Sequence, residues 1–178
     1  FYGIRSQITS FILGDSVTHI PDLLCDEMEN LTSLTIPNGV TTIGKTAFCT
    51  CTSLSSINIP NSVTSIGDMA FNNCSSLVSV TLGNGITSIG NNVFDNCSSL
   101  TSIKIPDQVT YIGNSAFYNC SSLTSINIPN NVANIGDMAF NNCSSLVSVT
   151  LGNGITSIGN NVFDNCSSLT SIKIPDQV

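Results

Sequence analysis

Apolar residues recur along this chain with a period of 23 residues, in units that read roughly L-x-x-I-x-I-P-x-x-V-x-x-I-G-x-x-A-F-x-N-C-S-S. Residues 66–109 return unchanged as residues 135–178, an offset of 69 residues or three units. A fixed short period is typical of stacked repeats, in which each unit buries its apolar face only against its neighbours. The sequence therefore predicts a single elongated array. Its regular units begin at Leu31, Leu54, Leu77, Leu100, Leu123, Leu146 and Leu169.

Each unit divides into three segments. Stretches such as LTSIKIP alternate apolar and small polar residues, which predicts a half-buried strand that ends at a proline, or at Gly83 or Gly152 in the units that lack one. The following V-x-x-I-G predicts a shorter extended segment, with a glycine such as Gly67 at a sharp corner. Stretches such as DMAFNNC are too short for a free helix, so we expect one helical or 3₁₀ turn there, with a phenylalanine such as Phe94 filling the coil.

The expected fold is a repeat solenoid, a right-handed coil with a parallel β-sheet on its concave face and strands about 4.8 Å apart. Because the first residue is Phe1 and the chain ends within a unit at Val178, we expect a fragment that has lost further repeats. The patterns divide it into an N-terminal lead at 1–7, a degenerate capping repeat at 8–30, six regular 23-residue repeats at 31–168 and a truncated last repeat at 169–178.

The charge balance excludes some partners. The chain has only four Lys and Arg residues and a net charge of -7, too few clustered cations to neutralise several phosphates. We therefore expect neither a nucleic acid nor an anionic membrane surface as a partner. The sequence contains no run of about 18 apolar residues and no secretory signal pattern, so we expect no membrane insertion by this stretch.

Candidate catalytic and metal chemistry is sparse. His19 is the only histidine, so no catalytic triad or multi-histidine metal site can be assembled, and we expect no enzyme, no metal and no cofactor. The acidic residues of the first unit lack the spacing of a calcium loop, which favours a solvated cap face over a cation site. Those residues are Asp22, Asp26, Glu27 and Glu29.

The cysteines follow the repeat. Six of the eight recur every 23 residues, which favours reduced, buried thiols over disulfides. A Cys25–Cys49 bridge is the alternative, because Cys25 stands where the next unit carries Phe48. The recurring six are Cys51, Cys74, Cys97, Cys120, Cys143 and Cys166.

Five N-C-S sequons also follow the repeat, and glycans on rungs about 4.8 Å apart would collide. We interpret these asparagines as a stacked ladder that satisfies backbone groups. They are Asn73, Asn96, Asn119, Asn142 and Asn165, and a sixth sequon lies at Asn30.

The repeat resembles the BspA-like leucine-rich repeats of bacterial and protozoan surfaces, through residues 98–106 (SSLTSIKIP) and 109–120 (VTYIGNSAFYNC). The resemblance covers residues 8–178 and implies a leucine-rich-repeat solenoid that displays a binding surface, often for adhesion to host or matrix proteins. It also implies a cell-surface or secreted location.

Outward positions of the first strands are the candidate binding residues, since the alternate positions are committed to the core. We expect a protein-interaction or adhesion module that binds a host, matrix or identical protein by weak, repeated contacts on the concave sheet. The alternative is a structural spacer or an array that associates end to end through open strand edges. The candidates are Ser56, Asn58, Ser79, Thr81, Ser102, Lys104, Ser125, Asn127, Ser148, Thr150, Ser171 and Lys173, preceded by Ser33 and Thr35.

Overall fold

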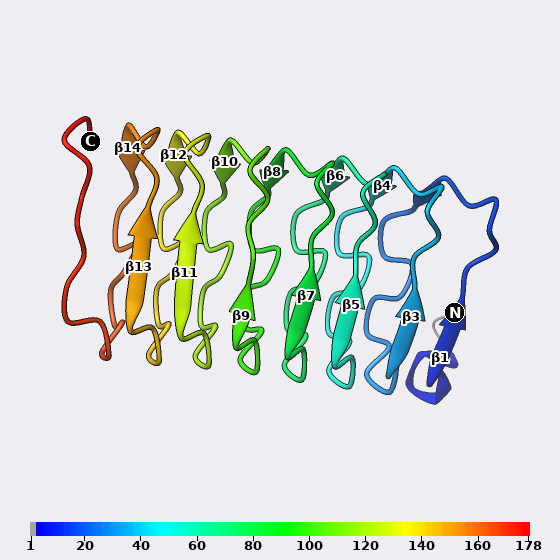
Figure 1. Cartoon of the computed structure of the whole chain (residues 1–178). Helices are drawn as coiled ribbons and strands as arrows, with labels where there is room; N and C mark the ends of the chain where they lie inside the picture. Colours follow the sequence, from blue (N-terminus) through cyan, green and yellow to red (C-terminus); the bar gives the residue numbers. More distant parts are fainter. Residues whose placement is uncertain (1–2) are drawn as a thin grey trace.

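The structure is a computed structural model that describes residues 3–178; residues 1 and 2 of the expected N-terminal lead lie outside the described residues. Figure 1 shows a row of coils stacked side by side, with the N-terminal coil at one end and the C-terminal coil at the other. The prediction of a parallel β-solenoid is confirmed, because strands pair in parallel at a constant offset of one 23-residue unit, as Ser56 does with Ser79. The four-part division of the chain stays a prediction.

Each coil contributes a first strand and a shorter second strand. The alternating residues of the first strand face outward and inward in turn, as in β5, where Ile57 is buried between exposed Ser56 and Asn58. The first strands are β1 (Ser10–Ile12), β3 (Ser33–Thr35), β5 (Ser56–Asn58), β7 (Ser79–Thr81), β9 (Ser102–Ile103), β11 (Ser125–Ile128) and β13 (Ser148–Leu151). The second strands are β2 (His19–Ile20), β4 (Thr42–Ile43), β6 (Ser65–Ile66), β8 (Ser88–Ile89), β10 (Tyr111–Ile112), β12 (Asn134–Ile135) and β14 (Ser157–Ile158).

The core runs the whole length of the stack. Six phenylalanine rings form one column inside the coils, with centroids 5.1–5.7 Å apart and planes within 18° of parallel. The expected role of these rings in filling each coil is therefore confirmed. The column comprises Phe48, Phe71, Phe94, Phe117, Phe140 and Phe163.

The expected helical turn is wrong, because the third segment of each coil is a run of hydrogen-bonded turns. Among the described residues the assigned helix is η1 (Arg5–Gln7), a single 3₁₀ turn before the first coil. In the turn segment, the N–H of Asn72 bonds to the carbonyl of Met69 within the coil, whereas the N–H of Phe71 bonds to Val93 of the next coil. Positive φ angles of 59° at Met69 and 58° at Asn73 interrupt any helix. The segment thus pairs with the neighbouring coil as a strand does.

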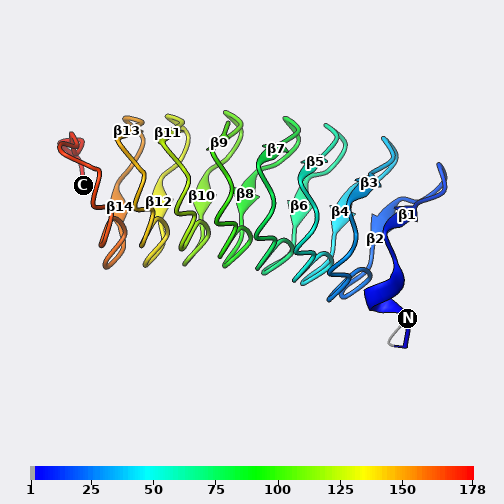
Figure 2. The ribbon, with the colours of Figure 1, turned by 90° about the horizontal axis from the view of Figure 1, so that it is seen from below.

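The missing helices also explain the shape of the stack. We expected the first-strand sheet on a concave side, but Figure 2 shows a slight bend with the row from β3 to β13 along its outer side. Helices are about 10 Å wide and strands about 4.8 Å apart, so helices opposite a sheet would spread that side and curl the sheet inward. Turn segments that hydrogen-bond directly to the next coil do not spread that side of the stack, so the sheet does not curl inward.

The glycine at the corner has a different role from the one we predicted. No glycine among the described residues has a positive φ, so the corner does not depend on glycine's conformational freedom. Instead a Cβ on Gly113 would lie 2.6 Å from the carbonyl carbon of Gly90. The glycines at this position allow the backbones of successive coils to approach.

Candidate binding surface

The outward positions of the first strands form a surface that we call the sheet face. It is continued by Ser171 and Lys173, although the strand expected in the last unit is not formed in residues 169–178. All fourteen of its side chains are exposed, whereas the residue between the two members in each coil is buried or half-buried. The role of the sheet face in binding stays a prediction. Its members are Ser33, Thr35, Ser56, Asn58, Ser79, Thr81, Ser102, Lys104, Ser125, Asn127, Ser148, Thr150, Ser171 and Lys173.

A hollow of about 670 Å³ lies where β5, β7 and the residue after β9 meet the turns that follow them. We call it the first hollow. Asn58, Thr81 and Lys104 line it in three successive coils, and Ile59 and Leu82 contribute apolar atoms. A hollow of about 430 Å³ adjoins it and shares Asn58 with it, so a groove follows the ends of the strands toward the N-terminal coils.

The turn asparagines beside the groove were missed by the sequence analysis as surface residues. Asn38, Asn61 and Asn84 line the first hollow. The Asn61 Oδ1 atom accepts a hydrogen bond of 2.9 Å from the N–H of Asn84 one coil further on. The sequence signal was their recurrence directly after each strand.

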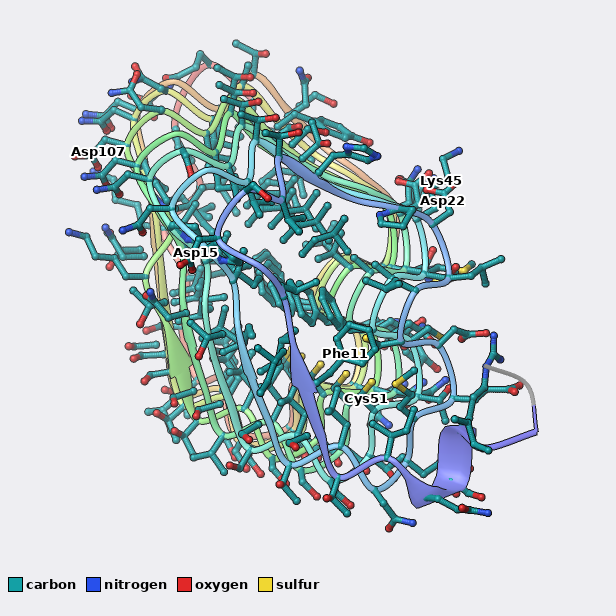
Figure 3. All side chains as sticks on the ribbon, turned by 90° about the vertical axis from the view of Figure 1, so that its right-hand side faces the viewer. Phe11, Asp15, Asp22, Lys45, Cys51 and Asp107 are labelled. Carbon is teal, nitrogen blue, oxygen red and sulfur yellow. The ribbon has the colours of Figure 1, made fainter. Side chains whose placement is uncertain are left out.

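The electrostatics of the sheet face rest on two lysines. Lys104 and Lys173 are exposed, and the ion pairs found among residues 3–178 belong to Arg5 alone. The remaining side chains of the face are serine, threonine and asparagine. Figure 3 places Lys45, beside Asp22, on the opposite side of the stack from Asp107. Both unpaired ammonium groups of the face are therefore available to an acidic partner.

The acidic residues of the first coil are partly engaged within the protein. The Arg5 guanidinium lies 3.3 Å from Asp26 and 3.1 Å from Glu27, which ties the N-terminal segment to the turn segment of that coil. Asp22 Oδ1 accepts a 2.7 Å hydrogen bond from the Lys45 N–H. Across residues 3–178, no three His, Cys, Asp or Glu side chains are grouped to hold a metal ion.

All eight thiols are free, as predicted for the six recurring cysteines, and the alternative Cys25–Cys49 bridge is not formed. The recurring thiols donate hydrogen bonds of 3.1–3.3 Å to backbone carbonyls of the preceding coil, as Cys74 does to Phe48. Burial raises the pKa of the Cys120 thiol well above its ordinary value. Cys49 is half-exposed, and burial also raises its pKa. The buried thiols therefore serve packing.

The sequon asparagines are only partly the ladder that we predicted. Asn119 donates a 2.7 Å side-chain hydrogen bond to Asn96, but backbone N–H groups bond to a different column, as Asn114 does to Asn91 Oδ1 at 2.9 Å. All five repeated sequon asparagines have positive φ angles, between 53° and 61°. Asparagine tolerates this conformation better than most residues, so the turn geometry accounts for them.

A family model decides what kind of repeat this is. The model of the BspA type leucine rich repeat region matches residues 1–120 and 87–178, in six copies. The chain belongs to this BspA-type family. No curated protein sequence matched it.

Solved structures place this BspA-type chain among bacterial leucine-rich repeat proteins. The leucine-rich repeat protein of T. pallidum is 30% identical, with a TM-score of 0.87 over 92% of this chain and 78% of that one. A leucine-rich cell surface protein of Faecalibacterium prausnitzii is 26% identical, with a TM-score of 0.53 over 96% and 68%. The pneumococcal vaccine antigen PcpA shares the fold at 18% identity and a TM-score of 0.55, over 96% and 51%. The family and these neighbours indicate a repeat module for protein interaction.

The described part of this BspA-type chain contains no helix that is long and apolar enough to cross a membrane.

Proposed function

We propose that this chain is a non-enzymatic adhesion module, displayed at a cell surface or secreted, that binds a host or matrix protein through the sheet face. The observation that carries the proposal is the sheet face itself: fourteen exposed side chains in parallel rows, bordered by a groove that is lined largely by polar side chains. Repeated equivalent contacts raise overall affinity even when each contact is weak. The face has no tryptophan, tyrosine or arginine anchor, so its affinity depends on that repetition.

The surface location is supported by the likeness to the F. prausnitzii protein, which is described as a cell surface protein. The proposal of a non-enzymatic role is supported by the position of His19, which is exposed on β2. Its Thr42 partner in the sheet carries no acid–base group.

Capture on extracellular-matrix proteins and on epithelial cells tests the proposal. The Asn58→Arg/Asn127→Arg variant places two bulky cations on the sheet face, and the Lys104→Glu/Lys173→Glu variant reverses both of its charges. We expect each to reduce capture at least about tenfold, because steric and like-charge obstacles at a contact cost more than 1.4 kcal/mol. Lys45→Glu, on another side of the stack, is the matched control. Equal capture of all variants with intact thermal unfolding would remove the sheet face as the interface.

A second candidate function is end-to-end self-association. In the N-terminal coil, β1 and β2 pair with only one neighbouring strand each. Ile12 is 91% exposed, and a hollow of about 470 Å³ is lined by apolar groups that include Leu13 and Val17. Light scattering over a concentration series separates the two functions. Growth in mass that Ile12→Asp abolishes favours the spacer, whereas a constant monomer mass favours the adhesion module.

A further inference from the structure

Two places on the sheet face are built from the same residues. Because residues 66–109 and 135–178 are identical, Thr81, Gly83 and Lys104 return three coils later. The first hollow contains the earlier set. A second hollow of about 230 Å³ contains Thr150 and Lys173 of the later set, together with Val149, Leu151, Asn153 and Pro175, and Gly152 lies between two of its lining residues in the sequence.

The backbone makes the same close approach beside both hollows. A Cβ on Gly83 would lie 2.4 Å from the carbonyl oxygen of Pro60, and one on Gly152 would lie 2.5 Å from that of Pro129. Glycine is therefore required at both positions, where most other units carry proline. The backbones of successive coils therefore approach closely beside both hollows.

Several hydrogen-bond donors lie beside each hollow. The Asn61 oxygen is occupied by the N–H of Asn84, which leaves the Asn61 amide NH₂ as the free end of that side chain. Asn130 makes the same 2.9 Å bond with the N–H of Asn153 beside the second hollow. The lysine ammonium and the threonine hydroxyl add further donors at each place, so each set of groups suits a carboxylate.

The separation of the two sets points to the shape of the ligand. Three coils span roughly 14 Å at the spacing of paired strands. An extended polypeptide rises about 3.4 Å per residue, so carboxylates four residues apart on the same face of it are also about 14 Å apart.

We infer that the Thr81–Lys104 and Thr150–Lys173 pairs are twin subsites that together bind one extended acidic polypeptide segment, which lies along the stack and carries carboxylates four residues apart. This inference rests on the proposed function, because it specifies the partner chemistry of the sheet face. Lys104 and Lys173 are the cations of that face.

Fluorescence anisotropy with labelled serine-rich peptides tests the inference at about 50 mM salt, where charge interactions are weakly screened. The peptides carry two glutamates separated by three serines, two glutamates separated by one serine, one glutamate, or two glutamines separated by three serines. We expect the first to bind at least about tenfold more tightly than the others, since two linked contacts gain from effective concentration. Lys104→Met and Lys173→Met should each abolish that gain, whereas Lys45→Met should leave it intact.

Equal binding of the two spacings, or a gain that survives both single lysine changes, would overturn the twin subsites. So would binding of a sulfated heparin oligosaccharide in place of the acidic peptides. The matrix and cell capture assay distinguishes this failure from failure of the proposed function. If Asn58→Arg/Asn127→Arg still prevents capture while the lysine-to-methionine variants bind normally, the sheet face remains the interface and the acidic ligand is wrong.

Discussion

The Cys120 thiol donates a 3.2 Å hydrogen bond to the carbonyl oxygen of Phe94, which lies 26 residues earlier and one coil away. Both residues are fully buried. The thiol thus satisfies a carbonyl beside the phenylalanine column and is itself shielded from water. Burial raises the pKa of this thiol, and it raises that of Cys143 to about 12.

Stability should fall at alkaline pH because of these thiols. Above about pH 9 the unfolded chain loses thiol protons while the folded chain keeps them. The free energy of unfolding therefore falls by up to about 1.4 kcal/mol per pH unit for each buried thiol. Urea unfolding under reducing conditions at pH 7, 9 and 10 measures the effect. Cys97→Ala/Cys120→Ala should show a shallower decline above pH 9, and an equal slope would contradict the assignment.

Removing one ring from the middle of the column should destabilise the protein strongly. Phe94 is stacked between Phe71 at 5.6 Å and Phe117 at 5.4 Å and is fully buried. We expect Phe94→Ala to cost about 3–5 kcal/mol in the free energy of unfolding. Phe163→Ala is the control, because that ring is only half-buried and has a single stacked neighbour among the described residues. Equal urea midpoints for the two variants would contradict a larger stabilising contribution from rings in the middle of the column.

A methyl group between coils should be costly only where the backbones meet. Gly113→Ala would place its Cβ 2.6 Å from the carbonyl carbon of Gly90, and we expect a loss of about 1–3 kcal/mol. Gly14→Ala is the matched control, because a Cβ there meets no atom within 4 Å. Thermal unfolding of the pair measures the difference. A neutral Gly113→Ala would show that successive coils can separate at this corner.

Asp95 should be destabilising at neutral pH. One of its oxygens, Oδ1, is buried without a hydrogen-bond partner among residues 3–178, and burial raises the pKa of this carboxyl. Stability from its protonated form is lost as pH rises above the ordinary value of 3.8 through the higher folded value. Asp95→Asn should therefore raise the free energy of unfolding at pH 7, by less than about 1 kcal/mol because water screens a half-exposed group.

The gain from Asp95→Asn should disappear at pH 3, where the carboxyl is protonated in both states. Asp164 is the same residue three units later but is exposed, so Asp164→Asn serves as the control and should be nearly neutral. Denaturant titrations of both variants at pH 7 and pH 3 provide the comparison. A destabilised Asp95→Asn protein at pH 7 would refute this assignment.

The solenoid, the strands and the phenylalanine column could be predicted because each follows from one local period. Alternation in LTSIKIP predicts which residues face the core, and a fixed 23-residue offset predicts that Phe71 lies on Phe94. Family resemblance supplied the kind of repeat. None of this required knowledge of how one coil bonds to the next.

The turn segment and the bend depend on that bonding, which local propensity does not encode. A stretch such as DMAFNNC satisfies part of its backbone from the next coil, so neither its length nor its composition identifies the turns. The glycine at Gly113 was misinterpreted for the same reason, since the contact that requires it comes from Gly90. Likewise, the Asn61 NH₂ group is left as a donor because the Asn61 oxygen accepts a hydrogen bond from the N–H of Asn84 in the next coil.

The repetition of residues 66–109 at an offset of 69 also bears on how such a chain can change in length. Deletion or duplication of three whole coils between equivalent positions would join each remaining coil to a neighbour with the same sequence as before. Every ring stack, thiol hydrogen bond and glycine contact at the new junction would be re-formed, because each coil contacts only the coils beside it. Unequal recombination could therefore lengthen or shorten this protein, and with it the number of twin subsites, without an intermediate that fails to fold.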